Sequence, residues 1–327
     1  MNWRLKALAQ AAIARLPAKA ALEMYYHVQR ACGRLRRVNP LVGFQDGLRL
    51  IGAIEASGRR LADRAVLEVG TGRRINVPIA FWLCGAASVV TVDRHAYLKP
   101  SLIAKDLEFV KRHPAAVRAV FGARAEEPGF KQRFDLLVRG GLTVPELMAH
   151  AGIQYAAPAD AKMIPLNDGW IDFHVSNNVL EHVAPDELRG ILREGTRLLA
   201  LGGLCAHRVD FSDHFAECDS HISTVNFLRF SEEQWRTFAG NRYGYHNRLR
   251  IDELEAIVGE VGLEIVIEHA EIDGAARQAL EAGLTLDRRF ADKPINVNAT
   301  ASALLVLARR RSAHSPARRR VDVRATG

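Results

Sequence analysis

The stretch from residue 65 to residue 93 constrains this chain more than any other. An apolar run, Ala65–Val69, leads into Gly70-Thr71-Gly72, and a second apolar run, Ser88–Val92, ends at Asp93. Glycines let the backbone turn tightly and approach a ligand without a Cβ in the way, and Pro78 suits the first turn of the intervening helix. A carboxylate 23 residues after the first glycine can accept both hydroxyls of a ribose. The stretch therefore predicts a strand–turn–helix–strand unit that binds a nucleoside cofactor.

Strand-like apolar runs recur along the rest of the chain, separated by helix-like stretches such as Pro185–Leu199 and Ile251–Val261. This alternation predicts an α/β fold with a mostly parallel sheet covered by helices on both faces. The expected strands are Ala65–Val69, Ser88–Val92, Ile153–Ala156, Ile171–Ser176, Gly203–Val209, Leu263–His269 and Ala301–Ala308.

The 327 residues divide by pattern into three parts. Residues 1–60 have helical character, residues 61–310 hold the alternating strands and helices, and the Arg-, Ser- and Ala-rich residues 311–327 are expected to be disordered. Two intervals, about 98–151 and 210–250, are too long for simple crossovers. Long connections in a compact α/β domain are usually functional, so we interpret both as lid-like insertions.

The N-terminal stretch is basic and amphipathic, and no apolar run in the sequence approaches the roughly 20 residues of a membrane-spanning helix. We expect this stretch to pack against the core; a transit peptide or a membrane-surface helix is the alternative. Its apolar residues at near-helical spacing are Trp3, Leu5, Leu8, Ala12 and Leu16.

Cysteine usage indicates a reducing compartment. Cys32, Cys84, Cys205 and Cys218 lie far apart and form no CxxC pair. A disulfide framework is therefore not expected, and we predict a cytoplasmic protein.

The formal charge of +8 is concentrated at the two ends of the chain. Residues 1–40 carry +7 and residues 309–327 carry +6, which leaves −5 for the middle. A nucleic-acid enzyme usually places its positive field on the body that holds the substrate. The distribution argues against a nucleic-acid acceptor, and the basic termini suit peripheral contact with an acidic membrane.

Two motifs connect these features to a known family. Glu68-Val69-Gly70-Thr71-Gly72 resembles motif I of class I S-adenosylmethionine (SAM)-dependent methyltransferases. Asp160–Leu166, followed by Trp170–Val183 with its closing Leu-Glu-His-Val, resembles the type-11 methyltransferase subgroup. The resemblance covers roughly residues 65–210 and the last two strands. It implies a Rossmann-like core with a seven-stranded sheet, and SAM as the cofactor.

The resemblance also implies a set of cofactor-binding residues. The glycine-rich turn would line the methionine and ribose side, the acid at the tip of the second strand would hold the ribose, an Asp-Ala pair would border the adenine, and two asparagines at the tip of the fourth strand would face the sulfonium. These residues are Glu68, Gly70, Thr71, Gly72, Asp93, Asp160, Ala161, Asn177 and Asn178.

One position departs from the family pattern. Arg74 stands where motif I usually has its third glycine. Arg73 or Arg74 could pair with the carboxylate of the cofactor, although a solvated charge pair is the simpler interpretation.

Four residues are candidates for catalysis at the ends of the fourth and fifth strands. His182 has a pKa suited to a general base, although bracing its loop by hydrogen bonds is the simpler interpretation. His207, Asp210 and His214 end the fifth strand, and open α/β sheets bind ligands at such ends. They could form a His–Asp base or hold a divalent cation. No metal-ligand spacing is strong enough to predict a required ion, so we expect none.

The second insertion offers candidate acceptor-binding residues. Aromatic side chains alternate there with amide and guanidinium donors, which suits a polyhydroxylated or anionic small molecule. The alternative is a folded lid in which these groups satisfy one another, with Phe227, Phe230 and Trp235 as its core. The candidates are Arg229, Tyr245, Asn247 and Arg248.

We therefore expect an enzyme of the methyltransferase class that transfers a methyl group in line from SAM to an oxygen of a small molecule or glycan precursor. A non-catalytic SAM-binding sensor or scaffold is one alternative, favoured by Arg74 but opposed by Glu68, Asp93 and Asp160. An NAD-dependent oxidoreductase is another, since it also uses a glycine-rich turn and a ribose-binding acid. The missing third glycine and the Leu-Glu-His match oppose it.

Overall fold

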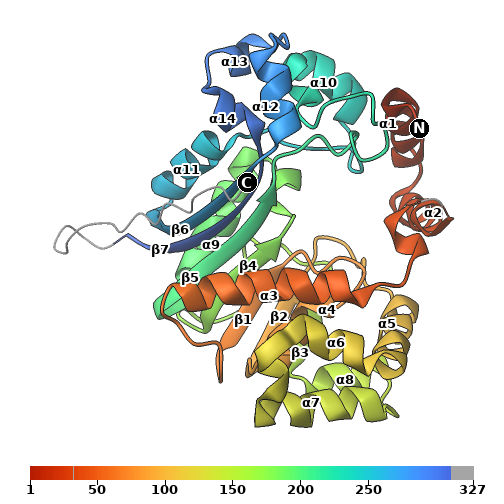
Figure 1. Ribbon diagram of the computed structural model, residues 1–327, viewed down its shortest axis with the longest axis vertical. Helices are drawn as coiled ribbons and strands as arrows, with labels where there is room; N and C mark the ends of the chain where they lie inside the picture. Colours follow the sequence, from red (N-terminus) through yellow and green to blue (C-terminus); the bar gives the residue numbers. More distant parts are fainter. Residues whose placement is uncertain (32, 311–327) are drawn as a thin grey trace.

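The computed structural model describes residues 1–31 and 33–310, so the expected basic tail at 311–327 and Cys32 lie outside the described residues. Seven strands form one sheet in the order β3-β2-β1-β4-β5-β7-β6 (Figure 1). The first five strands in this order, from β3 to β5, are parallel to one another, and β7 runs antiparallel to both β5 and β6. This is the Rossmann-like class I methyltransferase arrangement that the sequence predicted. The strands are β1 (Ala65–Val69), β2 (Ser88–Val92), β3 (Ile153–Ala156), β4 (Ile171–Asn177), β5 (Leu199–Asp210), β6 (Leu263–Ile272) and β7 (Thr300–Arg309).

Helices cover both faces of the sheet because successive strand residues point to opposite sides. Val66 packs with the helices of one face, and Leu67, the next residue, packs with those of the other. Both side chains are fully buried. The helices of the first face include α3 (Pro40–Ala56) and α4 (Asn76–Leu83), and those of the second are α9 (Pro185–Leu198) and α11 (Ile251–Glu260).

The 98–151 segment forms a packed helical layer beside β3 (Figure 1). Phe121, Phe130 and Phe134 are buried in the same core cluster as α3 and α4, so these helices extend the first face of the sheet. The layer consists of α5 (Pro100–Arg112), α6 (Pro114–Phe121), a 3₁₀ turn η2 (Gly122–Glu126), α7 (Pro128–Arg139) and α8 (Val144–His150).

A separate aromatic core builds a cap over the other end of the molecule (Figure 1). Phe227 and Trp235, expected as lid core, are buried in it together with Phe290. The cap combines most of the 210–250 segment with helices that precede β7. Its elements are η4 (Asn226–Arg229), α10 (Glu232–Ala239), α12 (Gly274–Glu281), α13 (Arg288–Ala291) and α14 (Ile295–Ala299).

The N-terminal helix α1 (Trp3–Ala14) packs onto this cap. Trp3 is 6% exposed and lies against Phe215 and Trp235. The expected apolar face was partly wrong, because Leu5 and Leu8 are 61% and 67% exposed. Burial follows the cap surface that α1 meets rather than the apolar spacing of the helix alone.

From the cap, α2 (Ala18–Ala31) runs along one side of the molecule toward α5, followed by η1 (Arg34–Arg36) (Figure 1). Over residues 1–31 and 33–310, no helix has the length and apolar character needed to cross a membrane. The three described cysteines, Cys84, Cys205 and Cys218, are free thiols.

Candidate functional site

The turn after β1 can only be built with glycine at its first position. Gly70 has φ +88°, and a Cβ on it would lie 2.3 Å from Cγ2 of Val179, which follows β4. The carboxyl ends of β1 and β4 therefore come close together at this turn. Such an edge of a parallel sheet is where α/β proteins bind ligands.

Gly72 and Asp93 form the centre of the predicted nucleoside site. The Gly72 N–H donates to Oδ2 of Asp93 at 3.0 Å, and the Tyr155 hydroxyl donates to the same oxygen at 3.1 Å. Both contacts engage Oδ2, which leaves Oδ1 to accept from a ligand. No heavy atom lies within 4 Å of a Cβ built on Gly72, so a ligand has room beside the turn. The residues therefore fit a ribose held by Asp93. Tyr155, on β3, was not anticipated from the sequence.

Glu68 lies beneath this turn. It is buried and accepts a 2.5 Å hydrogen bond from the Thr91 hydroxyl, which also pairs with Thr71. Burial raises the pKa of Glu68 to about 7. Burial likewise raises the pKa of Asp93 to about 7, against the opposing effect of its hydrogen bonds from Tyr155 and Gly72. Glu68 thus braces the turn through the two threonines.

Arg74, at the position of the missing glycine, is engaged within the protein. Its guanidinium pairs with Asp106 on α5, a carboxylate that also accepts from Asn76 at 3.1 Å. Asp106 is buried, so this pair is not the solvated one expected as the simpler interpretation. Where the family motif has a glycine, this chain has an arginine whose ion pair with Asp106 connects the cofactor turn to α5.

Arg73 is held by the N-terminal helix α2. Its Nε donates to Gln29 at 3.0 Å, and its guanidinium lies 5.0 Å from the ring centroid of Tyr26. Tyr25 of the same helix stacks on Tyr243 at 4.1 Å. Helix α2 therefore contacts both the cofactor turn and the segment that follows α10 of the cap.

The tip of β4 is fixed by its neighbours. Asn177 donates from Nδ2 to Asp46 on α3 at 3.3 Å. Asn178 has φ +54°, donates its N–H to the Arg208 carbonyl at 2.9 Å, and accepts from the Arg208 guanidinium at 3.2 Å. The two asparagines thus lie at the same strand edge as Gly70, as the resemblance implied.

The Asp-Ala pair follows β3, on the other side of the cofactor turn. Asp160 has an exposed side chain that accepts from the Lys162 N–H at 2.9 Å. Ala161 is half-buried against the second face of the sheet. Neither observation tests contact with an adenine ring, and that role stays a prediction.

Three imidazole rings gather beyond the ends of β4 and β5. His182 lies in the 3₁₀ turn η3 (Leu180–His182), His214 follows β5, and His246 comes from the end of the second insertion. The ring centroids of His182 and His214 lie 5.0 Å apart, and those of His214 and His246 lie 5.2 Å apart. The sequence predicted the first two of these residues but not His246.

Hydrogen bonds orient this histidine cluster. His182 Nδ1 lies 2.9 Å from the Tyr245 carbonyl, which can only accept, so Nδ1 carries the proton. Oδ2 of Asp210 lies 3.4 Å from Nε2 of His214. Burial opposes ionisation of Asp210, but His214 and Ser212 lower its pKa below the ordinary value. Burial by itself would lower the pKa of the His214 imidazole. The contact with the Asp210 carboxylate has the larger effect, so the pKa of His214 is raised above its ordinary value.

His207 does not join the cluster, contrary to the sequence-based expectation. It is 1% exposed, and its Nδ1 lies 2.8 Å from the Ser176 hydroxyl within the sheet. Strand β5 continues to Asp210, so His207 is an interior strand residue rather than a residue of the strand end. We therefore remove His207 from the catalytic candidates.

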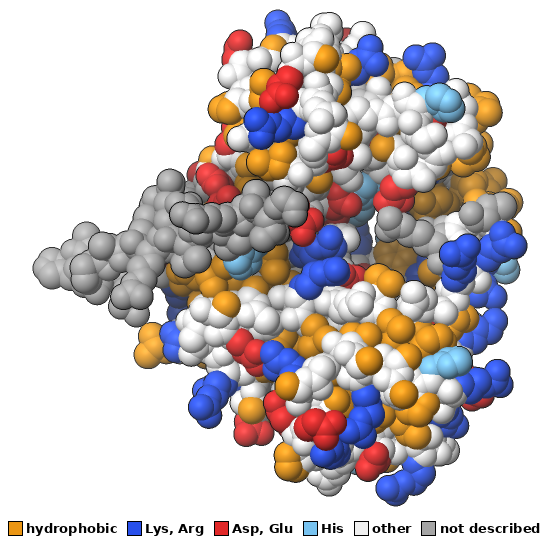
Figure 2. Space-filling view, in the orientation of Figure 1, with side chains coloured by type: hydrophobic (Ala, Val, Ile, Leu, Met, Phe, Trp, Pro, Cys, Tyr) orange, Lys and Arg blue, Asp and Glu red, His pale blue; other side chains and the backbone are white. Residues whose placement is uncertain are grey.

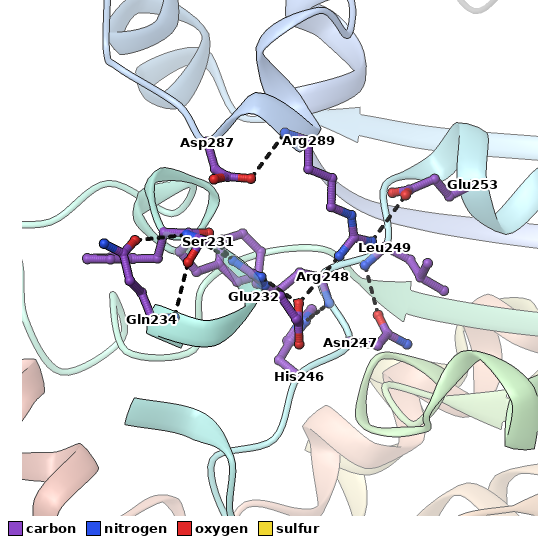
Figure 3. Close-up of polar contacts among 12 residues, drawn as sticks. Ser231, Glu232, Gln234, His246, Asn247, Arg248, Leu249, Glu253, Asp287 and Arg289 are labelled. Atoms are coloured by element: carbon purple, nitrogen blue, oxygen red, sulfur yellow. Dashed lines mark hydrogen bonds and ion pairs between the residues drawn. The ribbon is translucent and has the colours of Figure 1, made fainter. Parts of the chain in front are cut away.

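Two of the four predicted acceptor-binding residues are used by the fold instead. Arg248 is 1% exposed and donates to the carbonyls of Phe227 and Phe230 at 2.9 and 2.6 Å and to Glu232 at 2.6 Å (Figure 3). Asn247 Nδ2 donates to two carbonyls of the loop after β4, at 2.8 and 2.9 Å. The lid alternative therefore describes Arg248, whereas Asn247 ties the insertion to the loop after β4.

The other two predicted acceptor-binding residues remain accessible. Tyr245 is half-buried and lends its backbone carbonyl to His182, whereas Arg229 is exposed on the cap. No contact of either side chain with the histidine cluster is found among the described residues, and their binding role stays a prediction.

One cavity lies close to the edge of the sheet at which β5 and β6 end. It has a volume of about 310 Å³ and lies between α3 and strands β5, β6 and β7, lined in part by Arg49, Arg208 and Glu271. Figure 2 shows a hollow, bordered by basic and acidic side chains, between the cap and the lower half of the molecule. Arg208 connects this cavity with Asn178 at the cofactor edge.

Comparison with known proteins gives one family match and a set of similar solved structures. Residues 144–207 match the type-11 family model described as "Methyltransferase domain". No curated protein is similar enough to match the chain. Similar solved structures include the PH0226 protein from Pyrococcus horikoshii OT3, with 13% identity, 79% of this chain and 86% of that chain covered, and a TM-score of 0.42. A SAM-dependent methyltransferase from Methanosarcina mazei has 14% identity, 79% and 97% coverage, and a TM-score of 0.41.

The matched residues include β3, β4, the Leu-Glu-His turn and the first part of β5. SAM is the expected cofactor, and the match favours methyl transfer over the hydride transfer of an NAD-dependent enzyme. The match itself carries no information on the acceptor.

Proposed function

We propose that this chain, whose residues 144–207 match the type-11 methyltransferase family model, methylates an oxygen of a small molecule or glycan precursor by direct in-line transfer. One observation carries the cofactor half of this proposal. Asp93 presents a carboxylate beside the Gly72 N–H, and the space next to that glycine is open. This is the arrangement that a ribose requires at the end of β2.

When bound, SAM supplies a methyl group that is already activated on a sulfonium. The protein therefore has to hold the acceptor atom in line with the methyl carbon and sulfur of the cofactor and to prevent other orientations of the two reactants. Gly70 and Gly72 let the backbone come close to the cofactor, Asp93 accepts from the ribose hydroxyls, and the fixed tip of β4 at Asn178 bounds the transfer site.

The acceptor half of the proposal is supported by the histidine cluster. A hydroxyl acceptor must lose its proton as the new C–O bond forms, and this requires a base or an electrophile nearby. Asp210 is the last residue of β5, and His182 and His214 lie beside it in the loops that follow β4 and β5. Methyl transfer to an atom that already presents a free lone pair would not need such a base.

Calorimetric titration with SAM and with NAD tests the cofactor assignment. We expect saturable SAM binding that weakens tenfold to hundredfold in Asp93→Ala, because hydrogen bonds to a charged group contribute about 1.5–3 kcal/mol each. Asp186→Ala is the matched control, since that carboxylate is fully exposed. Folded protein that binds no SAM, or that binds it equally well without Asp93, would contradict the proposal.

Turnover separates an enzyme from a SAM-binding sensor. We expect release of S-adenosylhomocysteine when hydroxylated small molecules and sugar derivatives are supplied as acceptors. A protein that binds SAM with normal affinity but releases no S-adenosylhomocysteine with any acceptor class would favour the sensor.

A further inference from the structure

We propose that Glu181, His182 and His214 bind one divalent transition-metal ion beyond the ends of β4 and β5. One ligand atom from each of the three residues lies within 4.8 Å of the other two. The site rests on its own contacts, whereas its role in acceptor methylation rests on the proposed function. No metal was expected from the sequence because the three ligands are not regularly spaced along the chain.

Glu181 is a buried carboxylate that no charged or hydroxyl side chain satisfies. The residue is 1% exposed, and neither carboxylate oxygen has a side-chain hydrogen-bond partner among the described residues, although the N–H groups of Glu181 itself and of Asp210 lie near it. Placing a carboxylate in such an environment is costly unless a cation or donors compensate for it. A metal ion between Glu181 and the two histidines would supply that compensation.

The two histidines are held as metal-binding histidines usually are. Such a residue almost always donates its other ring N–H to a carbonyl or carboxylate, which fixes the ring and its tautomer. His182 Nδ1 donates to the Tyr245 carbonyl at 2.9 Å, which leaves Nε2 to coordinate. His214 lies against Asp210, with 3.4 Å between Nε2 and Oδ2.

His246 borders the site but is not a ligand. Its Nδ1 accepts from the Arg248 N–H at 3.0 Å, and its Nε2 lies 3.3 Å from the Asp210 carbonyl. Both nitrogens are therefore committed. The ligand set is two histidines and one carboxylate, which leaves coordination positions open for water or substrate.

The spacing suits a first-row ion after a small adjustment. Ligand atoms about 2.1 Å from one ion lie no more than about 4.2 Å apart, so the observed limit of 4.8 Å requires only slight closure. His182 is exposed at the surface of the cluster, which gives both the ion and an acceptor a route from solvent.

In the proposed function, an acceptor hydroxyl would occupy an open position on the ion. Coordination lowers the pKa of a bound hydroxyl, so its proton leaves to solvent. The oxygen then forms its bond to the methyl carbon as the bond from that carbon to sulfur breaks, which leaves S-adenosylhomocysteine and a methyl ether.

A second group of potential ligands provides the competing explanation for any metal that binds. His174, Cys205 and His207 also lie within 4.8 Å of one another, but all three are buried inside the sheet beneath α9. That set contains a thiolate ligand, whereas the proposed site contains none. A metal ion whose absorption spectrum depends on its ligands, such as Co²⁺, can therefore distinguish binding at the proposed site from binding at the His174, Cys205 and His207 group.

Titration of the chelator-treated full chain with Co²⁺, followed by visible absorption, tests the site. We expect one equivalent to bind with ligand-field bands and without a thiolate charge-transfer band. We expect Co²⁺ binding to weaken at least tenfold in Glu181→Gln and in His214→Gln. We expect it to weaken roughly 10- to 100-fold in Asp210→Asn, because His214 then loses the carboxylate that orients its ring. The matched control is His221→Gln, an exposed histidine 3.2 Å from Asp219, which should leave binding unchanged.

Three outcomes would overturn the site: no Co²⁺ binding, a thiolate charge-transfer band, or binding that survives both Glu181→Gln and His214→Gln. SAM affinity measured on the same preparation separates the two proposals. Normal SAM binding with no Co²⁺ binding removes only the metal site, whereas Co²⁺ binding without SAM binding removes only the methyltransferase assignment.

Discussion

At the scale of single residues, the cofactor site depends on an acid that is unusually hard to ionise. Asp93 is buried, and burial raises its pKa to about 7. A carboxylate accepts hydrogen bonds with both oxygens only when ionised. The affinity of the site for a ribose is therefore expected to depend on pH within the physiological range.

We predict that SAM affinity increases as the pH rises from about 6 to 8, because Asp93 loses its proton through its pKa of about 7. Calorimetry across this range measures the effect. Asp93→Asn should bind weakly at every pH and remove the rise. Glu68→Gln should retain it, since Glu68 accepts from Thr91 beneath the turn. A rise that persists in Asp93→Asn would assign the titration to another group.

Residues that the sequence suggested for substrate binding show how local composition can mislead. Arg248 and Asn247 belong to types that bind polyhydroxylated ligands, yet they donate to backbone carbonyls of the cap and of the loop after β4. Buried carbonyls need donors as much as ligands do. Sequence shows the donor but not which acceptor it will meet.

At the scale of elements, Arg248 joins η4 to α10 through Phe227, Phe230 and Glu232, as Figure 3 shows in part. We predict that Arg248→Met lowers the free energy of unfolding by about 2–4 kcal/mol, because buried carbonyls lose their donor. Urea denaturation measures the change. Arg229→Met, at an exposed position of η4, should stay within about 0.5 kcal/mol of the parent. Equal effects of the two substitutions would contradict the structural role of Arg248.

The strands were predictable as elements because their signals are local. The first three strands begin and end at the predicted residues, and the later four differ at their ends by a few residues. Apolar runs and glycine turns set these limits within short windows. His207 lies inside the predicted strand as well, and its burial follows from pairing with Ser176 of β4 on one side and Leu305 of β7 on the other, which no short window of sequence shows.

At the scale of the whole molecule, the N-terminal helices connect the cap with the cofactor turn. Trp3 inserts into the aromatic core of the cap, and α2 reaches Arg73 through Gln29 and Lys99 through Glu23. Figure 1 shows α1 and α2 along one side of the molecule. The Trp3 indole is the large apolar group of this connection, and hydrogen bonds from the Trp3 N–H to Asp219 and from Gln10 to the Tyr243 carbonyl add to it.

We predict that Trp3→Ala releases α1 from the cap at a local cost of about 3–5 kcal/mol, the range for removing a large buried side chain. Amide hydrogen exchange should accelerate in α1 and α2 while β1 and β4 keep their protection. Leu8→Ala, at a position 67% exposed, should leave exchange unchanged. Global loss of protection in Trp3→Ala would show that the helices are integral to the main core.

By itself, the sequence determined the order of strands and helices, the glycine-rich turn with an acid at the end of β2, and the placement of His182, Asp210 and His214 at the ends of the fourth and fifth strands. Each of these follows from short-range periodicity and from the rule that parallel strands end on the same side of a sheet. Tertiary structure alone decided which side chains face a partner: Trp3 inward and Leu8 outward, His207 inside the sheet, Arg74 on Asp106, and Glu181 buried beside two histidines. The reason is that burial and pairing depend on surfaces contributed by residues far away in the chain, and periodicity cannot specify those surfaces.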